Sequence, residues 1–350
     1  MSKLYNFISA GDFENKIISK GNHFPSVDFS EGYLNKLCVL LHHQIQIEEI
    51  MSHLGISERE FELRIDELVR EGLIKEEGRE YVLSFPCITQ KEGDEFYRLS
   101  KVAGSKIEKL IVDHLDEIRT KTGLIESLAA YQFEELSFFI ISGVMLDFIQ
   151  IDYVEKYFLQ SERPSRNGSS YYFSLMQKTS AVKEPFGIYG NHCKGFGDFS
   201  LCMYGNDRYS TKNFITMNEE EIKSELHISN EGQLIKRIRT GVENDSIMTK
   251  GMEKIHLMND HVMVPLITNE DYKLLINVAR ILTEDLIHVL EKERTALIEA
   301  HNLSTYENKT TFEEYFIWYY HFLYTYITDS LIDKGVITKA KNRAFSYILV

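Results

Sequence analysis

Residues 47–83 carry the pattern that most limits how this chain can fold, because its element boundaries are marked residue by residue. Apolar residues at helical spacing end at Gly55, and Ser57 with Glu60 three positions later forms a capping box that starts a new helix. That helix is expected to end at Gly72. Two short apolar runs follow, joined by a polar turn that contains a glycine, which is typical of a β-hairpin. The segment therefore predicts helices followed by a small hairpin.

A further helix is expected just before this segment. Four residues recur at helical spacing there, namely Leu34, Leu37, Cys38 and Leu41. The expected helices are Glu31–His43, Ile47–Leu54 and Ser57–Gly72, and the expected strands are Leu73–Lys75 and Tyr81–Leu83. The third helix would bury one apolar face, formed by Phe61, Ile65, Leu68 and Val69.

Three helices and then a small hairpin is the element order of a winged helix-turn-helix. Residues 31–90, about sixty of the 350, resemble the winged-helix domains of bacterial regulators such as the ArsR and MarR families. The matching residues are Ile56 and Ser57 at the turn, Phe61, Ile65 and Leu68 on the buried face, and Glu71, Gly72, Leu73 and Ile74 before the wing. The resemblance implies that the segment binds DNA through Ser57, Arg59, Arg64, Lys75 and Arg79.

The charge of this segment argues against a DNA contact. The whole chain has 53 acidic and 39 basic residues and a net charge of −14, which excludes a protein that coats nucleic acid through bulk charge. Residues 31–90 hold twelve acidic and six basic residues, so the segment is itself acidic. Seven positions of the third helix are expected to be exposed, and four are acidic: Glu58, Arg59, Glu60, Glu62, Leu63, Arg64 and Asp66. Carboxylates beside phosphates are repelled and release no counterions.

Three functions remain open on this basis. The leading hypothesis is a one-component transcriptional regulator, in which the winged helix binds DNA and the C-terminal region senses a ligand or a partner. The alternative is an interaction module or adaptor, whose acidic third helix binds a basic peptide or protein and no DNA. The third is an enzyme with an appended winged helix, although the sequence offers no convincing pair of nucleophile and base. Neither a cofactor nor a metal is expected.

The whole chain predicts an α+β fold that is mainly helical, with a large C-terminal region that mixes helices and short antiparallel strands. Five segments are expected: a lead-in (1–30), the winged helix (31–90), a helical region (91–160), a mixed β-rich region (161–267) and C-terminal helices (268–350). Strands are expected at Tyr171–Met176, Phe186–Asn191 and Phe196–Tyr204, a second hairpin at 256–266, and helices at Asn218–Leu226, Glu231–Arg239, 268–301 and 311–334.

Residues 186–205 combine five glycines with aromatic and reactive side chains. A small-molecule or peptide pocket is one interpretation, and a β-meander that binds nothing is the other. The pocket would be lined by Tyr189, His192, Phe196, Phe199 and Tyr204. A metal site formed by His192, Cys193 and Cys202 has none of the usual zinc spacings, and adjacent residues on a strand point to opposite faces, so His192 would not activate Cys193.

A basic cluster lies further along the chain, at Lys236, Arg237 and Arg239. It is the densest in an acidic chain and predicts a contact with an anionic ligand or a phosphate backbone. The alternative is a solvated face of a helix, which is the commoner use of such a run.

The expected location is the cytoplasm. Cys38, Cys87, Cys193 and Cys202 are few, lack a framework spacing and follow no signal peptide, so reduced thiols are expected. No apolar run is long enough to span a membrane. A heptad seam at 275–300 and an aromatic helix at 311–334 suggest a homodimer, with packing inside one chain as the alternative.

Overall fold

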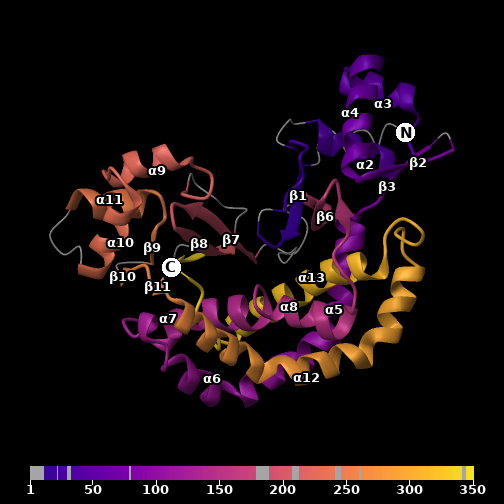
Figure 1. Cartoon of the computed structure of the whole chain (residues 1–350). Coiled ribbons are helices and arrows are strands. Elements are labelled where there is room, and N and C mark those ends of the chain that lie inside the picture. The colour runs from indigo at the N-terminus through magenta and orange to yellow at the C-terminus, as the bar shows by residue number, and fades with distance from the viewer. Residues whose placement is uncertain are drawn as a thin grey trace. The chain divides into compact units, whose positions relative to one another are not determined.

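The computed structural model describes residues 12–21, 23–29, 33–78, 80–178, 189–206, 213–240, 246–259, 262–340 and 344–350 (Figure 1). The fold is α+β and mainly helical, as the sequence predicts. The chain divides into two compact units, each built from three separate stretches. Unit 1 consists of Met1–Val102, Leu159–Phe186 and Leu290–Leu323, and unit 2 of Ala103–Phe158, Gly187–Val289 and Tyr324–Val350.

Unit 1 contains the predicted three helices and hairpin. Their bounds are α2 (Leu34–His42), α3 (Ile47–Leu54), α4 (Glu58–Glu71), β2 (Ile74–Glu77) and β3 (Glu80–Leu83). Gly55 and Gly72 end α3 and α4 in the left-handed conformation, with φ of 68° and 78°, and the Ser57 Oγ accepts a hydrogen bond from the Glu60 N–H at 3.3 Å. The element order of this helix–hairpin module (Leu34–Leu83) is therefore confirmed, and so are the bounds of α3, whereas α2 begins at Leu34 rather than Glu31 and β2 extends to Glu77 rather than Lys75.

A sheet of unit 1 supports this module. Its strands are β1 (Asp12–Ser19), β6 (Ser169–Lys178) and β4 (Cys87–Ile88) in the order β1-β6-β4, and β5 (Ser165–Arg166) also pairs with β6. The expectation that residues 1–30 are only a lead-in is wrong, because residues 12–19 pair antiparallel with β6. Alternate residues of β6 (Tyr171, Phe173 and Leu175) are buried in one core cluster with the apolar faces of α2 and α4.

Buried charges in unit 1 have several partners each. The Arg166 guanidinium forms an ion pair with Glu314 at 2.9 Å and donates hydrogen bonds to the backbone oxygens of Tyr171 and Ser84. Glu71, at the end of α4, accepts hydrogen bonds from Ser26 at 2.5 Å, from Tyr171 at 2.5 Å and from Asn167 at 3.3 Å. Both side chains hold parts of unit 1 together through bonds rather than facing solvent.

The first stretch of unit 2 is helical, as expected, but it contains irregular turns. A π-helix, η2, covers a segment in which every residue is buried, and its Gly143 lies against the Tyr204 ring, where a Cβ would approach to 3.0 Å. The elements of residues 90–159 are α5 (Gln90–Asp113), α6 (Leu115–Thr122), η1 (Glu126–Leu128), α7 (Phe133–Ser137), η2 (Phe138–Val144), α8 (Gln150–Val154) and η3 (Glu155–Leu159). The division between the units falls inside α5.

The sheet of unit 2 has the order β11-β12-β8-β7. Its strands are β7 (Tyr189–Phe196), β8 (Phe199–Asn206), β11 (Leu266–Ile267) and β12 (Ala344–Leu349). The predicted strand Phe186–Asn191 is placed too early: β7 continues to Phe196, and the hairpin turns at Gly197, whose φ of 61° a glycine adopts without strain. Residues 186–188 lie outside the described residues. Strand β12, which has no counterpart among the predicted elements, pairs with both β8 and β11.

A cluster of short elements follows in unit 2. They are α9 (Glu219–Leu226), α10 (Glu231–Thr240), α11 (Ser246–Lys254), β9 (Met258–Asn259) and β10 (Val262–Met263). The two predicted helices are confirmed, and β9 and β10 pair antiparallel as the predicted hairpin requires, although residues 260 and 261 lie outside the described residues. These helices enclose a core with Phe196, Leu201 and Met203 of the hairpin β7–β8.

Two long helices, α12 (Asn269–Asn302) and α13 (Phe312–Asp333), confirm the predicted C-terminal helices. Most of the expected dimer seam is already buried in a single chain, at Leu275, Ala279, Leu282, Leu286 and Val289. The aromatic side chains of α13 from Tyr315 to Tyr324 are buried too. These residues therefore follow the alternative expectation, packing within one chain. Side chains that are already buried have no apolar area left to bury against a second copy.

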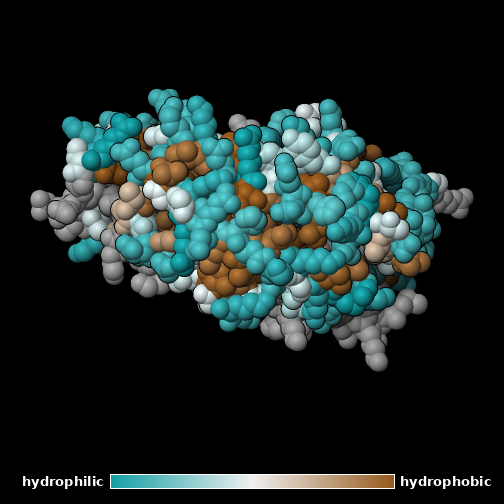
Figure 2. Space-filling model, turned by 90° about the horizontal axis from the view of Figure 1, so that it is seen from below, coloured by the Kyte–Doolittle hydropathy of each residue, from teal (hydrophilic) through white to brown (hydrophobic). Residues whose placement is uncertain are grey.

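The surface alternates between polar and apolar side chains on the face drawn in Figure 2. Apolar patches lie between hydrophilic residues on that face, as is ordinary for a folded chain. Within the described residues, no helix combines the length and the apolar character needed to span a membrane.

Candidate functional site

The exposed face of α4 is the surface that a winged helix would present to DNA. The helix buries Phe61, Ile65 and Leu68 against the core of unit 1. Its exposed residues are Glu58, Arg59, Glu62, Leu63, Asp66 and Arg70. Three of the six are carboxylates, and Leu63 leaves 54% of its surface in solvent. The predicted acidic character of the helix is therefore present on its exposed face.

Arg64, a predicted DNA contact, already has partners inside unit 1. Its guanidinium forms an ion pair with Glu67 at 2.7 Å and donates a hydrogen bond to the Tyr33 hydroxyl at 2.8 Å. The hydrogen bond to Glu67 and the one to Tyr33 raise the pKa of Arg64. The same Tyr33 hydroxyl donates to Glu60 at 3.2 Å, so this cation is fixed along the helix rather than extended toward solvent.

Carboxylates of α4 and of the wing face one tyrosine. Burial raises the pKa of Tyr81 on β3, and the negative charges of Glu76, Asp66 and Glu62 raise it further. The Tyr81 ring packs edge-on against Phe61, with 6.2 Å between ring centroids. Helix and wing thus form one continuous acidic surface beside an aromatic side chain.

The tip of the wing adds two more carboxylates. Glu77 and Glu80 are exposed and stand directly opposite each other in the β2–β3 ladder. Like charges in that position destabilise a hairpin, and a bound cation removes the repulsion. We call the exposed carboxylates of α4 and the wing the acidic surface: Glu58, Glu62, Asp66, Glu76, Glu77 and Glu80.

The predicted DNA contacts are therefore only partly available. Ser57 uses its hydroxyl as the N-cap of α4, and Arg64 is held by Glu67 and Tyr33. Arg59 and Lys75 are exposed, whereas Arg79 lies outside the described residues. Exposed carboxylates outnumber exposed basic side chains among the described residues of this surface, which disfavours a contact with phosphates.

The residues predicted to line a pocket in 186–205 are not brought together. Side chains alternate between the two faces of the β7–β8 hairpin. His192, Phe196 and Phe199 fall on the face that packs against α9–α11, while Tyr189 and Tyr204 fall on the other. Both tyrosines are buried there: Tyr189 donates to Asp329 at 2.5 Å, and the Tyr204 hydroxyl is hydrogen-bonded to Ser142 at 2.6 Å. A single pocket formed by all five is thus excluded by the pleat.

The cysteines of this hairpin are joined. The expectation of four reduced thiols is wrong for Cys193 and Cys202, which form a disulfide, while Cys38 and Cys87 are free and buried. The register places Cys193 opposite Cys202, with 4.1 Å between their Cα atoms. Residues nine apart in sequence become cross-strand neighbours because the hairpin turns midway between them.

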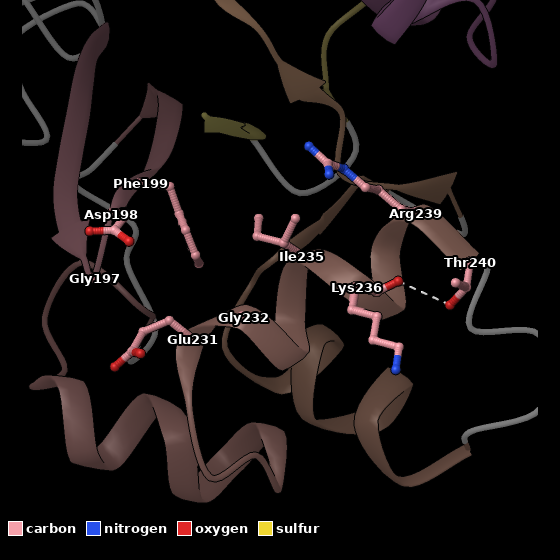
Figure 3. A pocket seen from close by; sticks show the side chains of 9 residues that line it. All are labelled: Gly197, Asp198, Phe199, Glu231, Gly232, Ile235, Lys236, Arg239 and Thr240. Atoms are coloured by element: carbon pink, nitrogen blue, oxygen red, sulfur yellow. Dashed lines mark hydrogen bonds between the residues drawn. The ribbon is translucent and has the colours of Figure 1, made fainter.

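A hollow lies beside the turn of the β7–β8 hairpin. It has a volume of about 640 Å³ and lies between the turn at residues 197–199 and one face of α10 (Figure 3). Phe199, Lys236 and Arg239, which the sequence assigns to two separate sites, line it together. Arg237 does not line it and instead donates to the Met248 sulfur at 3.3 Å.

The described residues offer no metal centre, since no three of their histidines, cysteines and carboxylates gather as ligands. Burial holds the pKa of His42 at about 3 and that of His321 at about 4, so both rings are neutral at physiological pH. No family model, curated protein or solved structure matches the chain.

Some residues of these surfaces were not singled out by the sequence. Tyr81 and Glu76 join the acidic surface only because the hairpin folds back beside α4. Ile235 could have been predicted from the sequence, because it lies on the same face of the helix as Lys236 and Arg239. The residues of α10 that line the hollow are 231, 232, 235, 236, 239 and 240, which is the spacing of one helical face.

Proposed function

We propose that the helix–hairpin module is a winged helix that binds a basic segment of a partner protein through its acidic surface. The observation that carries the proposal is the convergence of Glu62, Asp66 and Glu76 beside Tyr81. A lysine- or arginine-rich segment offers charge complementarity to these carboxylates and would relieve the repulsion between Glu77 and Glu80. The chain would act as an adaptor or regulator through protein contact.

The surface also has the apolar component that protein interfaces use. Leu63 is 54% exposed between the carboxylates of α4, and Tyr81 is half-buried on β3, next to the tip of the wing. Aromatic side chains supply much of the energy of protein interfaces, and surrounding charges fix register and speed association. A partner with alternating basic and apolar residues fits this arrangement.

DNA binding is the competing proposal, as in a one-component regulator. Arg59, Arg70 and Lys75 are exposed and are the cations that would contact phosphates. They lie among the carboxylates of the acidic surface, and Arg64 is bound to Glu67. Three scattered cations release few counterions, so only weak, salt-sensitive binding would be expected.

Charge reversal separates the two proposals. The variant Glu62→Lys/Asp66→Lys changes two exposed residues one turn apart on α4, and Glu284→Lys/Glu299→Lys on α12 makes the same change in net charge elsewhere. The probes are a fluorescein-labelled octalysine peptide and a random-sequence DNA duplex, both at low salt. We expect the α4 variant to weaken peptide binding by about tenfold, the scale of one to two lost charge pairs, and the α12 variant to leave it near the wild-type level.

Two outcomes would contradict docking of a basic segment. One is equal loss of peptide binding in both variants, which would reduce the interaction to net charge. The other is a DNA shift by the wild-type protein at micromolar concentration that disappears in Arg59→Ala/Lys75→Ala, which would establish the regulator that binds DNA.

A further inference from the structure

We infer that the hollow beside α10 in unit 2 binds a small organic acid: a carboxylate attached to an aromatic or branched apolar group. This site is separate from the proposed docking surface of unit 1 and does not depend on it. Its volume of about 640 Å³ lies within the usual range for small-molecule sites. The lining combines an apolar floor, cations and a close turn, and each part has a structural cause.

The apolar floor is formed by Phe199 and Ile235. Both are half-buried and pack against the core of α9–α11, so each keeps one side in the hollow. The buried Phe196 fixes the Phe199 ring from below in an edge-on contact, with 5.6 Å between ring centroids. A floor whose side chains are already ordered loses little conformational entropy when a ligand covers it.

The cations of the hollow are available to a ligand. Lys236 and Arg239 are exposed, and within the described part of the chain neither forms an ion pair. Figure 3 shows the Arg239 guanidinium on the opposite side of Ile235 and Phe199 from Asp198. An acid group bound at Arg239 would therefore place its apolar part over the floor, and guanidinium groups can bind a carboxylate through two parallel hydrogen bonds.

The carboxylate of α10 that lines the hollow, Glu231, is paired with a lysine that it shares with two other carboxylates. Glu231 forms an ion pair with Lys223 at 2.7 Å, and the hydrogen bond from Lys223 holds the pKa of Glu231 at about 2. Lys223 also forms ion pairs with Glu219 at 2.7 Å and with Glu220 at 3.5 Å, so it offsets the charge of Glu231 only in part. Figure 3 shows Asp198 and Glu231 on one side of the lining and Lys236 and Arg239 on the other, so an acid is expected to bind at the basic end.

Gly197 lets the turn approach the helix. A Cβ on this residue would lie 2.8 Å from the Glu231 Cγ, and its φ is +61°. The missing side chain lets Phe199 reach the hollow from a strand while Ile235 and Arg239 reach it from a helix. Phe199 and Arg239, forty positions apart in the sequence, thereby line the same hollow.

Methyl NMR on the full chain gives a readout inside the hollow. The δ1 methyl of Ile235 is assigned as the signal lost in Ile235→Val, and 3-phenylpropanoate is titrated against the wild-type protein. We expect a saturable shift of this methyl with Kd in the millimolar range, which is ordinary for a ligand of about eleven heavy atoms. The neutral analogue 3-phenylpropan-1-ol should bind about tenfold more weakly, because it offers no charge to Arg239.

Variants of α10 separate the hollow from general basicity. Arg239→Ala should weaken binding of 3-phenylpropanoate about tenfold and Lys236→Ala two- to threefold, as expected for a paired and a longer-range cation. Arg237→Ala removes the same charge from the same helix but outside the hollow, so it should leave Kd unchanged. The inference is overturned by an unshifted Ile235 methyl at about 20 mM ligand, by equal binding of acid and alcohol, or by equal effects of Arg237→Ala and Arg239→Ala.

Discussion

Helix α4 of unit 1 and helix α10 of unit 2 both bury one apolar face and expose charges on the other, but their cations have different surroundings. On α4, Arg64 is bound to Glu67 and to the Tyr33 hydroxyl, and the exposed Arg59 and Arg70 share the helix surface with three exposed carboxylates. On α10, Lys236 and Arg239 border a hollow without an ion pair to any described residue. A basic residue therefore marks an anion site only where it has no acidic neighbour of its own.

The same distinction separates buried from exposed charge within unit 1. Arg166 is buried with four polar contacts, so its charge serves folding. Among the described residues, the carboxylates of the acidic surface have no comparable set of donors, and two of them, Glu77 and Glu80, face each other across a hairpin. Charges that are satisfied internally stabilise the unit, and charges that oppose each other are candidates for binding a partner.

The largest effect is expected from removing the buried cation Arg166. Arg166→Ala leaves Glu314 buried with its charge unpaired, which destabilises a protein by about 3–5 kcal/mol. Urea denaturation of the purified chain measures this change in the free energy of unfolding. The double variant Arg166→Met/Glu314→Leu is the control, because removing both charges should recover most of the loss.

If Arg166→Ala unfolds no more easily than wild type, the buried ion pair does not stabilise unit 1. The distinction between cations that serve folding and cations that can bind a ligand is then contradicted. A double variant as unstable as the single one would instead show that the shape of the Arg166 side chain matters more than its charge.

Acidification should weaken unit 1 through its buried histidines. The pKa of His321 is lowered to about 4, mainly by burial; the hydrogen bond to the Ile317 carbonyl opposes the shift, and the nearby charges of Lys16 and Arg163 add to it. The unfolded chain takes up a proton near pH 6.5 while the folded ring does not, so stability is present above pH 6.5 and is lost as the pH falls toward 4. At pH 5 the loss should be about 2 kcal/mol, since each pH unit below 6.5 contributes about 1.4 kcal/mol per histidine.

His321→Leu tests this sign. The stability difference between variant and wild type should move by about 2 kcal/mol in favour of the variant between pH 7 and pH 5. The exposed His288 on α12 provides the matched control, His288→Gln, which is measured over the same pH range. If the stability difference between His321→Leu and wild type does not change with pH, the His321 ring takes up a proton in the folded state as readily as in the unfolded chain.

Unit 2 should respond to pH in the opposite direction. Burial raises the pKa of Asp147, while the hydrogen bond from Tyr324 opposes the shift. A carboxyl that prefers to be neutral in the folded state makes stability fall as the pH rises from its unfolded value near 4 through its folded value. Asp147→Asn keeps an acceptor for Tyr324 and removes the charge, so it should stabilise the protein at pH 7 by about 1 kcal/mol or more.

The measurement is thermal unfolding of Asp147→Asn and wild type at pH 7 and at pH 3.5. The variant should have the higher midpoint at pH 7, and the gap should close at pH 3.5, where Asp147 is protonated in both states. A lower midpoint at pH 7 would show that the charged form is the one the fold stabilises.

Local signals in the sequence were enough for the helices. Gly55, Gly72 and the Ser57 cap each act within one turn of the chain, so the boundaries of α3 and α4 follow from neighbouring residues. Strands β1 and β12 escaped prediction because their stability depends on pairing with β6 and β8, far away in sequence. Nothing in residues 12–19 alone indicates that they pair with β6.

The pocket residues show how a small error in a turn changes a site. Ending the first strand at Asn191 leaves His192 to Gly195 for a loop, where any side chain can point inward. The observed turn at Gly197 puts these residues into β7, and the pleat then separates Tyr189 and Tyr204 from Phe199. The link from Phe199 to Arg239 needed the tertiary contact of Gly197 with Glu231, which no spacing in the sequence encodes.

The smallest effects return to the two helices. Arg64→Ala should lower the free energy of unfolding by about 0.5–1 kcal/mol, because its ion pair with Glu67 is partly exposed, with 21% of the Arg64 side chain in solvent. Lys236→Ala and Arg239→Ala should each change it by less than about 0.5 kcal/mol, since neither side chain contributes an ion pair to the described structure. Urea denaturation of the three variants in one buffer gives the comparison. If Arg239→Ala destabilises the protein as much as Arg64→Ala, Arg239 is a structural residue, and the hollow loses the cation on which its choice of an acid depends.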